Sequence, residues 1–185
     1  MTRAFALLRG INVGRAKRVA MADLRRLMEE LGFTDVRTLL NSGNVVFSTS
    51  ERLTAATAVS IEQALLARTG VTSRVTLLSQ PKLAAVAAAN PLTGIASDPS
   101  RLMVTFLDDP EDRTRMRAIA DAAWDPDRIV IGKDASYAWH PDGVLANRLG
   151  TAIGRIAWNT ATARNWATVL KLLAAADPPR RPTGS

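Results

Sequence analysis

The first 78 residues alternate between apolar runs typical of strands and apolar positions at helical spacing. Residues 5–8 are uniformly apolar and predict a buried strand, whereas apolar residues recur every three or four positions over 24–31 and predict a helix. Residues 36–40 and 45–48 predict two more strands, and the Asn-Ser-Gly-Asn stretch at 41–44 is typical of a tight hairpin turn.

A second helix and a fourth strand complete this pattern. Ala58, Ile61 and Leu65 share one helical face, Gly70 is typical of a helix end, and the β-branched residues of 71–78 predict a strand. The resulting order, βαββαβ, is that of the ferredoxin-like plan, in which two helices cover one face of an antiparallel sheet. We therefore expect an α+β fold.

The second half repeats this order in part, with slight residue identity between the halves. A strand at 102–107 precedes a helix capped by Asp109, and strands follow at 128–131 and 136–139; helices are expected from residue 145 on, in place of a last strand. We expect two tandem ferredoxin-like units at 1–78 and 102–176, the second modified by C-terminal helices, a connecting helix and loop at 79–101, and a flexible tail at 177–185.

Composition narrows the class of protein. The 185 residues are 47% hydrophobic and 22% charged, as in soluble globular proteins, and no apolar run is long enough for a signal peptide or a membrane span, so we expect a cytoplasmic protein without membrane contact. With no cysteine and one histidine, no metal or cofactor is expected. The net charge of +7 favours a phosphate-rich partner where the bases cluster.

Such a cluster is predicted at one edge of the first sheet. The first two strands run parallel on either side of the third, so the loop after strand one and the turn at 41–44 emerge at the same edge. This edge gathers cations, amides and loop N–H groups suited to an anion, namely Arg9, Asn12, Lys17, Arg18, Asn41, Ser42 and Asn44. The alternative is structural, because loop glycines supply unusual φ angles and asparagines often bond their own backbone.

The C-terminal stretch holds a second candidate. Thr162 is expected to cap a helix whose first turn contains Arg164 and Asn165, with Trp166 and Val169 turned inward. Arg164 and Asn165 would join the anion site if this helix folds back to the same edge. Alternatively, Arg164 fastens the helix to the neighbouring unit.

Other motifs have structural explanations. His140 lies in His-Pro-Asp-Gly, the signature of a type I turn, and has no second histidine to act with. Tyr137 and Trp139 alternate on a strand, where core packing is favoured over stacking on nucleic-acid bases. The acids of 108–112 surround a helix start, and neither a Walker loop nor a GxGxxG motif is present.

Several of these motifs together resemble the bacterial domain-of-unknown-function family 1697. The resemblance rests on ALLRGINVG, on MADLRRLMEELGFTDVRTLLNSGNVVFS, on NPL and on TARNWATVLKLL, and it implies a tandem of two ferredoxin-like units with no assigned reaction. The chain departs from the family pattern at Arg15 and Ala167, where glycine and asparagine are frequent in the family. The motif positions are Arg9, Gly10, Asn12, Gly14, Met21, Leu24, Ser42, Gly43, Asn44, Arg164, Asn165, Trp166 and Thr168.

Three function classes follow from the sequence. The leading hypothesis is a binding module for a phosphate-bearing ligand, a small molecule or nucleic acid, at the basic edge. The alternatives are a metal-independent enzyme with its pocket between the two units and a protein-interaction scaffold. No catalytic constellation is recognisable, and neither the ligand nor the oligomeric state follows from the sequence.

Overall fold

The first half forms a four-stranded antiparallel sheet with two helices on one face. The computed structural model describes residues 1–14, 17–144, 147–157 and 161–176. The strand order is β2-β3-β1-β4, so β1 and β2 both pair with β3 and run parallel to each other, as predicted. We call these elements the first unit: β1 (Thr2–Leu8), α1 (Met21–Glu30), β2 (Thr34–Leu39), β3 (Asn44–Thr49), α2 (Ala55–Thr69) and β4 (Val75–Ser79).

Local sequence signals set the ends of α2 and α3. Thr54 begins α2 with a capping box shared with Thr57, and Gly70 ends it in the left-handed conformation, with φ of 69°. The predicted connecting helix is α3 (Gln80–Ala88), where Ser79 is the N-cap and Pro81 lies in the first turn.

The second half contains one strand more than predicted. Its sheet has the order β6-β7-β5-β8 and repeats that of the first. The added strand is β8 (Thr162–Asn165), which pairs antiparallel with β5. The second unit comprises β5 (Leu102–Phe106), α4 (Pro110–Ala120), β6 (Arg128–Ile131), β7 (Ala135–Trp139), α5 (Arg148–Ala157) and β8, and α6 (Trp166–Ala176) follows it.

The prediction that Thr162 caps a helix containing Arg164 and Asn165 is therefore wrong. These residues are extended because the edge of β5 offers them a ladder of hydrogen bonds, a partner that no local sequence signal reveals. The cap lies three residues later, where the Thr168 N–H donates to Asn165 Oδ1 at 2.9 Å. On α6, Leu172 is buried in the core and Leu170 is exposed.

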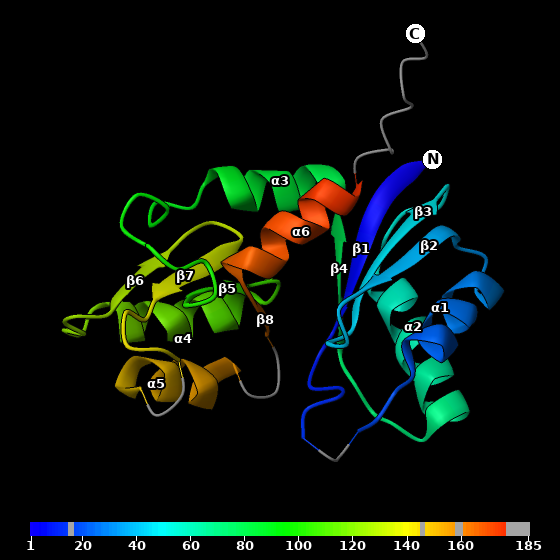
Figure 1. Ribbon diagram of the computed structural model, residues 1–185, viewed down its shortest axis with the longest axis horizontal. Coiled ribbons are helices and arrows are strands. Elements are labelled where there is room, and N and C mark those ends of the chain that lie inside the picture. The colour runs from blue at the N-terminus through cyan, green and yellow to red at the C-terminus, as the bar shows by residue number, and fades with distance from the viewer. Residues whose placement is uncertain (15–16, 145–146, 158–160, 177–185) are drawn as a thin grey trace, which may run out of the picture.

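Three apolar cores hold these layers together. α1 and α2 cover one face of the first sheet and α4 and α5 one face of the second, each over its own core. α3 and α6 lie side by side against the other faces, and the third core joins both halves through them (Figure 1). Tyr137 and Trp139 are buried in this shared core, as the packing interpretation predicted.

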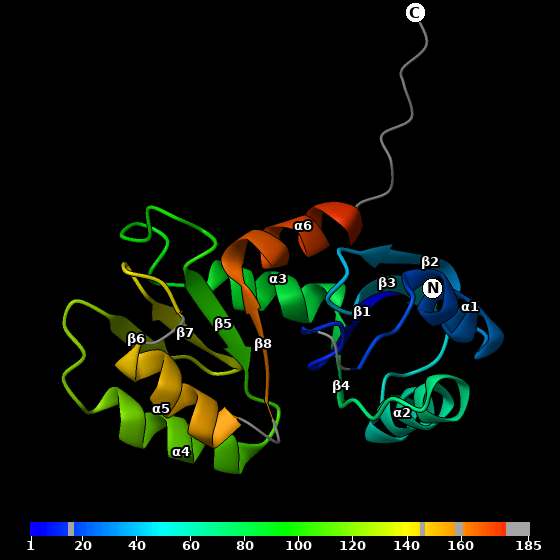
Figure 2. The same ribbon diagram turned by 60° about the horizontal axis from the view of Figure 1, so that its bottom comes forward.

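Polar contacts also tie the two halves together. The Thr76 hydroxyl on β4 and the Thr162 hydroxyl on β8 are hydrogen-bonded at 2.9 Å in the interior. Arg37 donates to the carbonyl of Ala175 at 2.7 Å, at the negative end of α6. In Figure 2, β4 and β8, the edge strands of the two sheets, face each other across the boundary between the units. Within the described residues, no helix has the length and apolar character needed to cross a lipid bilayer.

Candidate functional site

The loop after β1 and the turn between β2 and β3 lie against each other, as the strand order predicted. Asn12 Nδ2 donates to the carbonyl of Asn41 at 2.8 Å, and the Leu8 N–H donates to the carbonyl of Gly43 at the same distance. Gly43 has φ of 73°, and a Cβ there would lie 2.7 Å from Leu8 Cβ. The approach of the two segments therefore requires glycine at this position.

The side chains of Asn12 and Asn44 are engaged in the structure of the loops at this edge. Asn12, at φ of 56°, also donates to the carbonyl of Val19 at 2.9 Å, and its Oδ1 accepts from the Val19 N–H at 2.8 Å. Asn44 is fully buried and donates to Ser42 Oγ and to the carbonyl of Leu39. These amides hold the two loops in shape and have little capacity left for a ligand.

Arg164 connects the two units. From β8 its Nε donates to Asn44 Oδ1 at 2.6 Å and its Nη2 to the carbonyl of Leu8 at 2.6 Å, with a longer contact of 3.2 Å to the carbonyl of Ser42. Burial lowers the pKa of Arg164 to about 10, which leaves it protonated at neutral pH. The geometry agrees with the alternative in which this arginine fastens the C-terminal segment to the neighbouring unit.

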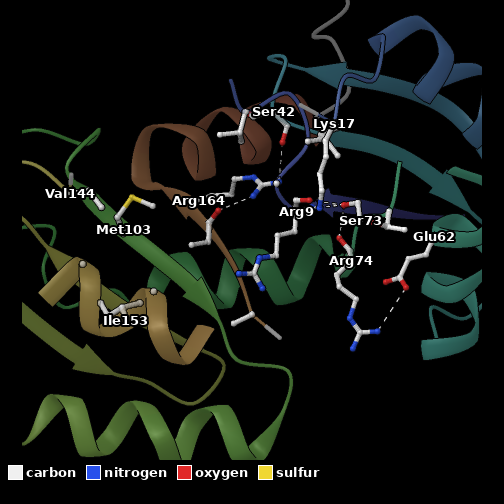
Figure 3. A pocket seen from close by; sticks show the side chains of 18 of the residues that line it. Arg9, Lys17, Ser42, Glu62, Ser73, Arg74, Met103, Val144, Ile153 and Arg164 are labelled. Carbon is white, nitrogen blue, oxygen red and sulfur yellow. Dashed lines mark hydrogen bonds and ion pairs between the residues drawn. The ribbon is translucent and has the colours of Figure 1, made fainter. Parts of the chain in front are cut away.

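A cleft opens between the two units, on the side away from α3 and α6. Its volume is about 1030 Å³, and it lies between α2 and the loop after β1 on one side and α5, β5 and β8 on the other. Figure 3 shows Arg9 and Arg74 extending into it from the first unit, while Met103 and Ile153 face it from the second. The volume suits a small-molecule ligand.

Arg9 is the most unusual group in this cleft. Its main chain is fixed, because its N–H bonds Ser73 Oγ at 2.9 Å and its carbonyl accepts from the same hydroxyl at 2.8 Å. In the guanidinium, Nη1 is fully buried and has no hydrogen-bond partner among the described residues. Burial lowers the pKa of Arg9, and the negative charge of Asp112 on α4 opposes that shift.

The other charges of the cleft leave it positive. Lys17 also lines it, and Arg74 Nη1 lies 3.9 Å from Glu62 Oε2, so this pair is close to neutral. Glu62 additionally accepts the N–H of Val75 at 2.8 Å. Arg9 and Lys17 therefore give the first-unit wall an excess of positive charge, which favours an anion.

His140 forms part of the second-unit wall. The predicted turn is present, since the Gly143 N–H donates to the His140 carbonyl at 2.9 Å, yet the imidazole is 1% exposed and lines the cleft. Its Nδ1 lies 3.6 Å from Asp127 Oδ1, which in turn accepts from Asn147 Nδ2 at 2.9 Å. Burial lowers the pKa of His140 against the opposing effects of Asp127 and Asn147, which favours the neutral imidazole.

The structure divides the predicted site residues into two sets. Arg9, Lys17, Ser42 and Arg164 line the cleft. The others are outside its lining: Asn12, Asn44 and Asn165 are bound to neighbouring groups, and Arg18 and Asn41 are exposed. Arg15, where the chain departs from the family pattern, lies outside the described residues.

Sequence reasoning missed several residues that the cleft brings together. Ser73, Arg74 and Glu62 are separated from Arg9 by more than fifty positions, and no motif links them. His140 was assigned to its turn, a correct assignment that gave no signal of where the side chain lies. Among the described residues, no group of three histidine, aspartate or glutamate side chains is placed to hold a metal ion.

Comparison with known proteins identifies the family. The family model described as "Protein of unknown function (DUF1697)" matches residues 1–137. The chain belongs to this family. The match covers the RGINVG loop and the β2–β3 turn and ends before Arg164 and Asn165.

The fold has a counterpart among solved structures. The conserved bacterial protein SP0830 from Streptococcus pneumoniae superposes with a TM-score of 0.75 at 23% identity, covering 95% of this chain and 99% of that one. This similarity supports the α+β architecture of the whole chain. No curated protein matches the sequence.

Proposed function

We propose that this protein binds a small, phosphate-bearing anion in the cleft between its two units. The carrying observation is the guanidinium of Arg9, which extends into the cleft beside Lys17 (Figure 3). A cation lining a partly apolar cleft attracts an anion more strongly than one in open water, because the surroundings screen its charge less. An oxygen of an anion bound in the cleft would balance the charge of Arg9.

The surroundings of Arg9 support an anion more than a neutral ligand. Lys17 adds a second cation to the same wall, and Glu62, the carboxylate among the described lining residues, is paired with Arg74 and accepts the N–H of Val75. Asp112 on α4 also acts on Arg9 but is not part of the lining. This proposal keeps the chemistry predicted for the basic edge but moves the site from the outer loops into the cleft.

Calorimetric titration with pyrophosphate tests the proposal. We expect binding to the wild type beyond that of chloride at matched ionic strength, and loss of binding in Arg9→Met, which keeps the apolar stem and removes the charge. The main-chain bonds of Arg9 to Ser73 do not need its side chain, so the variant is expected to fold. Arg26→Met on α1, an exposed arginine remote from the cleft lining, is the matched control.

Two results would overturn this function. One is a wild type that responds to pyrophosphate no more than to chloride, and the other is an Arg9→Met variant that binds as tightly as the wild type. A third arm uses labelled single-stranded RNA at two salt concentrations. Steeply salt-dependent RNA binding that survives Arg9→Met but is lost in a Lys17→Ala, Arg18→Ala double variant would replace the cleft by a nucleic-acid surface on the exposed loop.

For the fold, the proposed description is a tandem of two ferredoxin-like units with boundaries near residues 78 and 102. The repeated strand order supports it, since β2-β3-β1-β4 and β6-β7-β5-β8 correspond strand by strand. In this description α3 and α6 are equivalent helices that follow the last strand of each unit.

A further inference from the structure

The two walls of the cleft differ in chemistry. The first-unit wall carries Arg9, Lys17 and the Arg74–Glu62 pair. The opposite wall is built largely from small or apolar side chains, namely Met103, Val144, Ile153, Gly154, Ala161 and Ala163. Arg164 starts from that wall, but its guanidinium is bound by Asn44 and main-chain carbonyls of the first unit. A ligand that fills the cleft therefore meets charge on one side and apolar surface on the other.

Gly154 places no side chain on the apolar wall and leaves open space over α5. It lies inside α5, where glycine is about 0.8 to 1 kcal/mol less favourable than alanine, yet its φ is not in the left-handed region. A Cβ built on it meets no atom within 4 Å. Packing does explain the other glycine of this wall, Gly150, since its Cβ would lie 2.8 Å from the carbonyl of Val144. Neither backbone geometry nor packing requires glycine at position 154. A need for open space over the helix would explain the absence of a side chain there.

Apolar side chains also line the opposite lip. Val59 and Leu66 lie seven residues apart, on one face of α2, and both line the cleft although they are 43% and 47% exposed. Val13 in the loop after β1 is 69% exposed and lines it too. Exposed apolar side chains that surround one opening are typical of a binding site rather than of scattered surface residues.

Polar side chains inside the cleft accompany this apolar lining. Arg9 extends into it from the first unit (Figure 3), and His140 lines the opposite wall with its Nδ1 3.6 Å from Asp127 Oδ1. An apolar cleft with a few polar groups of this kind is the usual composition of a small-molecule site.

We propose that the ligand is amphipathic: an anionic group meets Arg9 and Lys17, and an aryl or acyl body lies over Gly154 and against Val59 and Leu66. This inference rests on the proposed function, because it assumes that the anion binds in the cleft. It adds the ligand class, a phosphate ester of an apolar group rather than inorganic phosphate or pyrophosphate. A neutral hydrocarbon would leave the cations of the first-unit wall uncompensated, and a bare anion would leave the apolar wall in water.

The test compares 1-naphthyl phosphate with inorganic phosphate by titration calorimetry. We expect the ester to bind the wild type at least tenfold more tightly than inorganic phosphate. Gly154→Leu should remove this advantage, because its side chain fills the space over α5, and should leave the affinity for inorganic phosphate unchanged. Gly154→Ala is the matched control: it adds one methyl group to open space and should retain at least half of the advantage.

A second variant tests the same contact if Gly154→Leu does not fold. Leu66→Gln changes an exposed residue on the other lip, so it should fold and lower the ester affinity severalfold without affecting inorganic phosphate. If pyrophosphate and inorganic phosphate bind through Arg9 but the naphthyl group adds nothing, or if both Gly154→Leu and Leu66→Gln leave the ester affinity intact, the amphipathic ligand is refuted and the anion site stands. If no phosphate compound binds, both proposals fail.

Discussion

Replacing Arg164 by methionine tests how the two units are held together. The substitution removes the donors to Asn44 Oδ1 and to the carbonyl of Leu8, both at 2.6 Å, while keeping most of the apolar volume. Hydrogen bonds from a charged donor contribute about 1.5 to 3 kcal/mol each. Burial of the charge offsets part of this, as the lowered pKa of Arg164 indicates. We therefore expect the free energy of unfolding to fall by about 2 to 4 kcal/mol.

Urea unfolding followed by circular dichroism measures this change, with Arg26→Met on an exposed face of α1 as the control. A double-mutant cycle with Asn44→Ala isolates the bond between the two side chains, for which a coupling of about 1 to 3 kcal/mol is expected. A loss in Arg164→Met no larger than that in Arg26→Met would refute the role of Arg164 as the connection between β8 and the first unit.

Three further outcomes follow from single contacts. Gly43→Ala should lower the free energy of unfolding by about 2 kcal/mol or more, since its Cβ would lie 2.7 Å from Leu8 Cβ at a positive φ; thermal unfolding that matches the wild type would contradict this. Burial lowers the pKa of His140 in the folded chain. As the pH falls below the ordinary histidine pKa near 6.5, the unfolded chain therefore binds more protons than the folded chain. Stability should then decline as pH falls from about 7 to 5, and His140→Gln should flatten the decline in urea midpoints. Tyr137→Phe removes the bond from its hydroxyl to the Val86 carbonyl at 2.7 Å and should cost about 1 to 3 kcal/mol in the same assay; an unchanged midpoint would contradict it.

Much of the fold could be read from local patterns. Apolar periodicity, the Asn-Ser-Gly-Asn turn and glycine at position 70 are properties of short segments, and they placed the first unit correctly up to the ends of its strands. The same holds for Asp109 as the cap of α4, where its side chain accepts the N–H of Glu111 at 2.8 Å. The predicted approach of the loop after β1 to the turn at 41–44 followed from strand order alone, and it is confirmed.

The formation of β8 and of the cleft depends on tertiary structure. Residues 162–165 carry no strand signal of their own and become extended because β5 has an edge to pair with, so the last strand of the second unit was predicted as a helix. The cleft joins Arg9 to Arg74, His140 and Gly154, which belong to different elements and whose proximity depends on how the shared core of α3 and α6 sets the two units against each other. A linear sequence records which side chains are present and the period at which they recur. Which of them face the same space is determined by packing between segments far apart in the chain, and this is why the sequence could place Arg9 and Lys17 on one loop but not beside Arg74 and His140 in a cleft.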